Sequence, residues 1–292
     1  VGLLLSGMAG RFVHQRAEDQ LYWTLRDLGA ERHLLIEREI AVAAESLLAL
    51  RSFFHASQHV SREEFSTFSK SLLKRRRGLA ALEWIPRVTN DIRVAHEEYI
   101  QAAGDAQYRI WELRPDGGRI PAGRREEYFP VQYTVPLAGN DAAVGFDLAS
   151  NPQRRGALER ARLLNTYVAT APVSLVQDEE KTPCVLLLLP IFRKLVPATS
   201  RAADPDALLG YVLAVIRIGD LIEQTLAGYP QDSIDILVTD ITAAGENEWI
   251  HTHRAAQNDG AAVDEPGKGP PRFSQEIEVG GRRSRLTSIA SE

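Results

Sequence analysis

The chain of 292 residues has few of the features that carry chemistry. It has one cysteine, Cys184, so an internal disulfide and a multi-cysteine zinc site are both excluded. Cys184 opens an apolar run at 184–189, where a thiol behaves as a small buried hydrophobe. Basic residues are not in excess, because 34 Lys and Arg stand against 39 Asp and Glu and the formal net charge is −5. Nucleic-acid partners are bound largely through Lys and Arg, so we expect none here.

Catalytic patterns are also missing. The Ser and Thr residues have neither a nucleophile-elbow nor a phosphate-loop context. His251 and His253 lie two apart on a predicted strand and share a face, which fits either a metal site or an exposed polar strand. Glu248 is the one carboxylate near them in sequence. We therefore expect no metal, no cofactor and no enzymatic activity in this part of the protein.

Proline is absent from residues 11 to 84, which favours a long helix. A stripe of apolar residues with steps of four and three predicts a helix with a coiled-coil type face at Ile36, Ile40, Ala43, Leu47, Leu50 and Phe54. A second stripe, at Leu21, Leu25 and Leu28, has the same spacing in another phase. We predict a stalk helix over residues 11–58 that pairs in a homodimer. The alternative is a long core helix of a monomer.

The first ten residues are apolar and do not begin with methionine. They are too few to cross a bilayer, which takes about 20 apolar residues. We interpret residues 1–10 as the remnant of a transmembrane helix and expect the full-length protein to be anchored in a membrane.

The remaining chain reads as α+β. Ser61 and Glu64 form a capping box that predicts a helix start. Strand-like and helical segments then follow without βαβ alternation, and residues 170–176 and 184–192 predict an antiparallel hairpin. Residues 194–206 are the best candidate linker. We predict one domain at 59–200 and a second at 201–292, which begins with a strand at 210–218 and ends in a hairpin around Gly280 and Gly281.

The most informative stretch comprises residues 127–136 and 145–152. It places one acid, Asp147, in an apolar and aromatic setting, just before a helix predicted to start at Asn151 and Pro152. An acid among apolar walls is typical of a small-molecule site. The alternative is that Asp147 only ties down the local turn.

Several segments in this order resemble the CHASE family, the extracytoplasmic sensory domains of bacterial cyclases, histidine kinases and plant cytokinin receptors. They are residues 127–131, 145–148, 157–161 and 189–192, with supporting landmarks at 84–88, 210–212 and 220–222. The resemblance covers roughly residues 30 to 290. It implies a fold of a long N-terminal stalk helix followed by two PAS-like antiparallel-sheet domains. The membrane-distal domain would bind a small ligand and the membrane-proximal one would not.

The resemblance also implies the roles of individual residues. Asp147 would hydrogen-bond the ligand, and backbone groups near Ala169 would complete the polar contacts. The walls of the pocket would come from Val131, Tyr133, Leu187 and Leu189. Many relatives have Thr-Gly after the helix where this chain has Leu164 and Asn165. Leu164 removes a hydroxyl from near the pocket, so the ligand need not be a cytokinin. We expect a cytokinin-like purine derivative or another small organic molecule.

These expectations define a sensor in the bacterial inner membrane with this part in the periplasm. The dimeric stalk would pass the signal to a cytoplasmic histidine kinase or diguanylate cyclase or phosphodiesterase, and so to a two-component or cyclic di-GMP pathway. One alternative is a protein-interaction or dimerisation module without a small-molecule ligand. Another, an autonomous hydrolase, requires a base and nucleophile pair that the sequence does not offer.

Overall fold

The computed structural model describes residues 2–74, 78–176, 178, 182–193, 207–229, 234–242, 248–254 and 271–290. The chain forms two compact units. The central unit comprises Glu39–Leu221 and Val279–Arg282, and the terminal unit comprises Val1–Arg38, Ile222–Glu278 and Arg283–Glu292.

The predicted long helix is present as α1, Gly2–Ala56. In the central unit its apolar stripe is covered by the chain itself, because Ala43 and Leu47 are buried and the ring of Phe54 lies 4.3 Å from that of Trp84. This part of the stripe therefore packs in the core of its own unit, as the monomer alternative predicts. Helix α2, Arg62–Leu73, starts at the predicted capping box, in which Ser61 Oγ accepts from Glu64 N and Ser61 N donates to Glu64 Oε2 at 2.9 Å.

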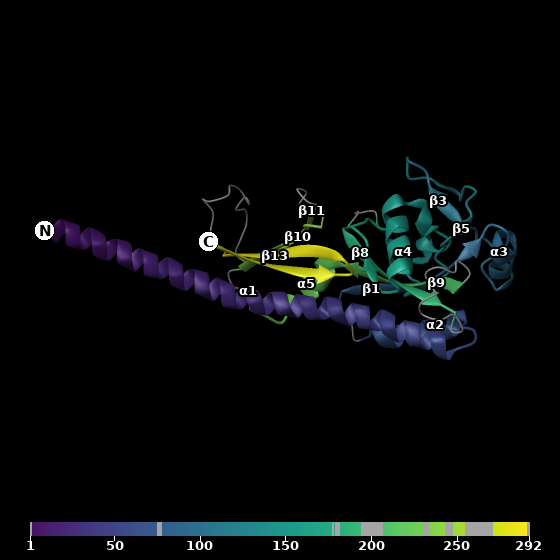
Figure 1. Ribbon diagram of the computed structural model, residues 1–292, viewed down its shortest axis with the longest axis horizontal. Coiled ribbons are helices and arrows are strands. Elements are labelled where there is room, and N and C mark those ends of the chain that lie inside the picture. The colour runs from purple at the N-terminus through teal and green to yellow at the C-terminus, as the bar shows by residue number, and fades with distance from the viewer. Residues whose placement is uncertain are drawn as a thin grey trace. The chain divides into compact units, whose positions relative to one another are not determined.

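The central unit is built on a five-stranded antiparallel sheet with the order β6-β1-β9-β8-β7, of which β1, β8 and β9 are labelled in Figure 1. The strands are β1 (Leu79–Pro86), β6 (Tyr133–Val135), β7 (Val168–Ala169), β8 (Cys184–Phe192) and β9 (Leu208–Arg217). The interior strands β8 and β9 are apolar along almost their whole length because both faces of the sheet are covered.

Strand β9 lies in the centre of this sheet, between β1 and β8. The predicted domain boundary after residue 200, with the strand at 210–218 in the second domain, differs from this arrangement. A continuous buried run such as Tyr211–Val215 needs a neighbouring strand on each side and a cover on each face, which the first sheet supplies. The predicted linker at 194–206 lies outside the described residues.

One face of the sheet is covered by Phe129, Val131, residues 146–149 and α4, Pro152–Leu164, which packs on β8. Helix α4 has the predicted ends. Asn151 caps it by accepting from Arg154 N, Pro152 is its first residue, and Asn165 follows in the left-handed conformation with φ of 50°. Smaller elements complete the unit: β2 (Val88–Thr89), α3 (Arg93–Ala102), β3 (Trp111–Leu113), β4 (Arg119–Pro121), β5 (Glu127–Tyr128), η1 (Asp141–Ala143) and η2 (Leu148–Ser150).

The terminal unit contains a four-stranded sheet with the order β11-β10-β13-β12. Its strands are β10 (Ile234–Asp240), β11 (Glu248–His253), β12 (Arg272–Val279) and β13 (Arg282–Ala290), and α5 spans Ile218–Leu226. Strand β10 alternates between buried and half-buried residues, and the turn at Gly280 and Gly281 joins β12 to β13 as predicted. The long helix followed by antiparallel sheets confirms the predicted α+β class. Within the described residues, no helix has the length and apolar content required to span a membrane.

Candidate functional site

A small cavity lies between the sheet of the central unit and its cover. Its volume is about 30 Å³, and most of its walls are apolar. The sheet contributes Leu186, Leu213 and Val215, and the cover contributes side chains that include Val131 and Phe146. A volume of this size holds one or two water molecules, since one water needs about 10–15 Å³ by this measure.

Two charged residues interrupt the apolar lining: Glu83 from β1 and Arg154 from α4. They are only 4% and 6% exposed. Thr134 Oγ1 donates to Glu83 Oε1 at 3.3 Å, and Arg154 Nη2 donates to the carbonyl oxygen of Ser174 at 2.9 Å. Arg154 Nε is buried and has no hydrogen-bond partner among the described residues. The cavity therefore has a polar end with an unused donor.

Burial alters the ionisation of this pair. It raises the pKa of Glu83 to about 7, although the hydrogen bond from Thr134 and the charge of Arg154 act in the opposite direction. Burial also lowers the pKa of Arg154, against the attraction of Glu83. Glu83 therefore takes up a proton at a higher pH than an exposed glutamate does. A buried cation next to a titratable acid in an apolar cavity is typical of a functional site.

Asp147 is fully buried and ties down the cover of the sheet. Its Oδ1 accepts from the N–H groups of Phe129 at 2.9 Å and of Ala149 at 3.1 Å. Its Oδ2 lies 3.4 Å from Arg125 Nη1 and accepts no hydrogen bond from the described residues. Burial raises the pKa of Asp147, against the two backbone hydrogen bonds and the charge of Arg125.

Asp147 lies between two hollows. Its chain neighbours Phe146 and Leu148 line the 30 Å³ cavity, but Asp147 is not among the lining residues. Its contact partners Arg125, Phe129 and Ala149 line a separate pocket of about 250 Å³. The carboxylate thus fixes a wall that these two hollows share.

The 250 Å³ pocket has a strongly charged rim. Glu127 forms ion pairs with Arg87 at 2.6 Å and with Arg162 at 3.3 Å. Tyr211 reaches the pocket from β9, and its hydroxyl donates to the carbonyl oxygen of Leu158 at 2.9 Å. Among the charged residues that line this pocket, Glu127 and Arg162 pair with each other, and Arg125 pairs with Glu112 outside it.

The structure does not bring the six predicted site residues together. Val131 lines the 30 Å³ cavity, whereas Tyr133 lies on the opposite face, with its ring 5.7 Å from that of Phe65. The predicted common face of Val131 and Tyr133 is wrong because the strand starts only at Tyr133 and Val131 pairs instead with Phe146.

Leu187 and Leu189 also face away from the cavity, which takes Leu186 from β8. Leu189 pairs with Val212, which pairs with Trp84 on the face that packs against α1.

The backbone groups of Ala169 are both used within the protein. Its N–H donates to the carbonyl oxygen of Gly280 at 3.0 Å, and its carbonyl oxygen accepts from Arg160 Nη2 at 3.2 Å. They are not free to bind a ligand in this arrangement.

Sequence reasoning missed Glu83 and Arg154, although each breaks a local pattern. Glu83 is a lone acid in the apolar strand 79–86. Arg154 is a cation in the first turn of α4, where the helix dipole favours anions. Residues that break the rule of their element are candidates for function.

The histidine pair of β11 also has a partner that the sequence did not suggest. Glu223 from α5 lies 3.1 Å from His251 Nε2 and 2.9 Å from His253 Nδ1. These contacts, together with the neighbouring histidines, lower the pKa of Glu223 despite its partial burial. Among the described residues, no group of three or more His, Cys, Asp or Glu side chains is arranged to hold a metal ion.

Comparison with known proteins gives the class and then the family. Hybrid signal transduction histidine kinase A of Dictyostelium discoideum is 24% identical over 231 residues, which cover 75% of this chain and 10% of that protein. The chain thus spans about a tenth of the length of this relative. The CHASE domain profile matches residues 58–251, which is more than half of the chain. The chain belongs to the CHASE family, whose members are extracellular, non-catalytic sensory domains of histidine kinases and cyclases.

Proposed function

We propose that the chain is the periplasmic sensor of a transmembrane receptor and that the central unit binds a small organic molecule. The ligand enters between the sheet and its cover, at the cavity bounded by Glu83 and Arg154. The proposal rests on the burial of Glu83 and Arg154. Burying two charged groups costs more than an apolar pair of similar size, so their retention next to a cavity favours a binding role.

The cavity in this form is too small for an organic ligand, so binding requires the cover to move. Such a movement is the event that a sensor has to transmit, because a ligand shifts a conformational equilibrium only by preferring one state. Glu83 and Arg154 Nε, which has no hydrogen-bond partner among the described residues, supply an acceptor and a donor at the polar end. This pair is complementary to an adjacent donor and acceptor on a ligand, such as those on the rings of purine derivatives.

Asp147 keeps its proposed role as polar anchor through Oδ2, which lies 3.4 Å from Arg125 Nη1 and accepts no hydrogen bond from the residues that the structure describes. Its Oδ1 holds the cover at Phe129 and Ala149. A donor of the ligand that reached Oδ2 would therefore act directly on the segment that closes the cavity.

We propose further that the receptor is a homodimer through α1 and is anchored in the bacterial inner membrane. In the terminal unit, α1 exposes large apolar side chains at Leu21, Trp23, Leu28 and Leu34. Leu21 and Leu28 are one heptad apart, which suits a coiled-coil contact with a second copy. The same observation favours the second candidate function, a dimerisation module without a small-molecule ligand. The output would be a cytoplasmic histidine kinase, a diguanylate cyclase or a phosphodiesterase.

The binding proposal is tested by calorimetric titration of the chain with adenine, N6-substituted adenines and small organic acids. A variant that fills the cavity, Val215→Ile, should weaken binding about tenfold or more without loss of thermal stability. Val212→Ile, on the opposite face of the same strand, is the matched control. Binding that is unaffected by both Val215→Ile and Glu83→Gln would place the ligand elsewhere and overturn the proposal.

The dimer proposal has its own test. Sedimentation equilibrium should show a dimer for the wild type and a monomer for a Leu21→Glu, Leu28→Glu double variant. A wild-type chain that stays monomeric up to hundreds of micromolar would remove the support for both the dimeric stalk and the dimerisation module.

A further inference from the structure

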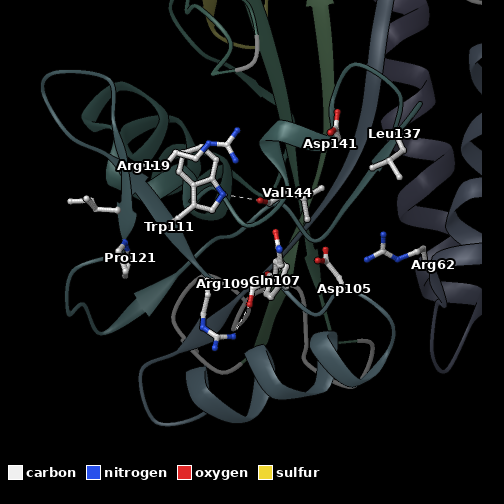
Figure 2. A pocket seen from close by; sticks show the side chains of 12 residues that line it. Arg62, Asp105, Gln107, Arg109, Trp111, Arg119, Pro121, Leu137, Asp141 and Val144 are labelled. Atoms are coloured by element: carbon white, nitrogen blue, oxygen red, sulfur yellow. Dashed lines mark hydrogen bonds between the residues drawn. The ribbon is translucent and has the colours of Figure 1, made fainter.

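A further hollow in the central unit lies outside the site bounded by Glu83 and Arg154. It has a volume of about 540 Å³, which is in the range of small-molecule pockets. It is bordered by the β3–β4 hairpin, the segment after α3, residues 137–144 and the first residue of α2 (Figure 2). It shares no lining residue with the 30 Å³ cavity or the 250 Å³ pocket. We call it the hairpin pocket.

The hairpin pocket is lined by charges of both signs. Arg62, Arg109 and Arg119 contribute cations, and Asp105 and Asp141 contribute anions. Figure 2 shows these side chains around one opening, with Arg119 and Trp111 on one side and Arg62 and Leu137 on the other.

Most of these charges lack a partner. Within the part of the chain that the structure describes, the side chains of Arg62, Arg119, Asp105 and Asp141 form no ion pair and no hydrogen bond. The guanidinium groups of the two arginines lie over aromatic rings. Ion pairs of 4.0 Å or less are formed elsewhere in the same unit, for example between Arg93 and Glu97. The acids and bases of the hairpin pocket thus face one opening without neutralising each other.

The guanidinium group of Arg119 is positioned to bind an anion. Its guanidinium carbon lies 4.4 Å from the centroid of the Trp111 ring. The ring is itself fixed, because Trp111 Nε1 donates to the carbonyl oxygen of Val144 at 2.7 Å. A guanidinium that stacks on a buried ring keeps its N–H groups free for a carboxylate. Arg109 is less available, since it donates to the carbonyl oxygen of Tyr108 and lies 3.7 Å from Glu97.

We propose that the hairpin pocket binds a zwitterion, an α-amino acid or a short peptide with free termini. The carboxylate of such a ligand pairs with Arg119 and the ammonium group pairs with Asp141 or Asp105. The two aspartates would repel a dianion, and the three arginines would repel a dication. A ligand with one charge of each sign is therefore the best match. Leu137, 49% exposed, and Ile120 provide apolar contact for the rest of the ligand.

The test is calorimetric titration with the twenty common amino acids and with Ala-Ala, each compared with its N-acetylated and C-amidated forms. At least one zwitterion should bind, and either cap should weaken its binding about tenfold or more, since each removes one charge-assisted contact. Arg119→Gln and Asp141→Asn should cause similar losses. Both residues are exposed, so the variants should keep the fold, which circular dichroism checks.

Two control variants separate this pocket from general charge effects. Arg114→Gln and Glu98→Gln change exposed residues of β3–β4 and α3 that do not line the pocket, and both should bind as the wild type does. The proposal is overturned if no zwitterion binds, if capped forms bind equally well, or if Arg119→Gln and Asp141→Asn have no effect. Stronger binding of succinate to Asp141→Asn than of any zwitterion to the wild type would define an anion site instead. Val215→Ile should leave this binding intact, so the outcome is independent of the sensor cavity.

Discussion

Ser288 Oγ lies 3.0 Å from Nε2 of His33, although the two residues are 255 positions apart in the sequence. Both side chains are fully buried in the terminal unit, where the imidazole also stacks on Phe273 with ring centroids 5.5 Å apart. The contact joins α1 to β13, the last described strand of the chain. It makes the stability of the terminal unit sensitive to acid.

Burial lowers the pKa of His33 to about 4, against an opposing effect of Gln275. The unfolded chain therefore takes up this proton at a higher pH than the folded chain. The contribution of neutral His33 to the free energy of unfolding is fully present above about pH 6.5. It falls as the pH drops toward 4, and the total loss is about 3 kcal/mol. Urea denaturation from pH 7 to 4.5 should show this loss in the wild type and a smaller loss in His33→Leu. The exposed-residue variant His59→Leu should follow the wild type, and parallel curves for all three proteins would contradict the prediction.

Glu83 should produce the opposite pH dependence in the central unit. Its pKa is raised to about 7 by burial, above the ordinary value of 4.5. The contribution of Glu83 to the free energy of unfolding is fully present below about pH 4.5. It is lost as the pH rises through 7, and the total loss is about 3 kcal/mol. Glu83→Gln should therefore be more stable relative to the wild type at pH 8 than at pH 5. Glu63→Gln, an exposed change on α2, should show no such trend.

Asp147 has a structural and a proposed binding role, and two substitutions distinguish them. Asp147→Ala leaves the buried N–H groups of Phe129 and Ala149 without an acceptor, so it should reduce the free energy of unfolding by about 3 kcal/mol or more. Asp147→Asn keeps one acceptor oxygen and should cost about 1 kcal/mol. If Asp147 anchors the ligand, the Asn variant should fold but bind about tenfold more weakly. Equal ligand affinity in Asp147→Asn and the wild type would limit Asp147 to its structural role.

Substitutions at Gly145 and Gly139 test how closely the cover of the sheet is packed. Both glycines have positive φ, 83° and 80°. A Cβ atom on Gly145 would overlap the carbonyl oxygen of Arg109, whereas one on Gly139 meets nothing within 4 Å. Gly139→Ala should cost about 1 kcal/mol from backbone strain alone, and Gly145→Ala about 3 kcal/mol or more. Denaturation curves of the two variants measure the difference in their free energies of unfolding. Equal losses of stability would show that the cover shifts to make room for the added Cβ atom.

The sequence predicted features that depend on neighbouring residues. The capping box at Ser61, the cap at Asn151 and the turn at Gly280 were all correct, because each motif satisfies its backbone within a few residues. The predicted strand at 184–192 is present as β8, but the predicted strand at 170–176 is wrong, because β7 covers Val168–Ala169 and Val173 forms only an isolated bridge with Cys184.

Features that depend on distant partners were not predictable in this way. The place of β9 depends on its pairing with β1, more than a hundred residues earlier. The separation of Val131 from Tyr133 depends on the pairing of Val131 with Phe146, which strand alternation cannot reveal. The Glu83 and Arg154 pair lies across two layers, so neither residue alone indicated a site.

The position of β9 has a consequence for how the protein forms on the ribosome. Until residue 217 has emerged, β1 and β8 lack the strand that joins them, and the sheet is two separate pieces. Closing such long sequence separations is slow, and the unpaired edges are open to aggregation in the meantime. A shortened clone that stops before residue 208 should accumulate as insoluble protein, whereas one that continues through Leu221 retains every strand of this sheet.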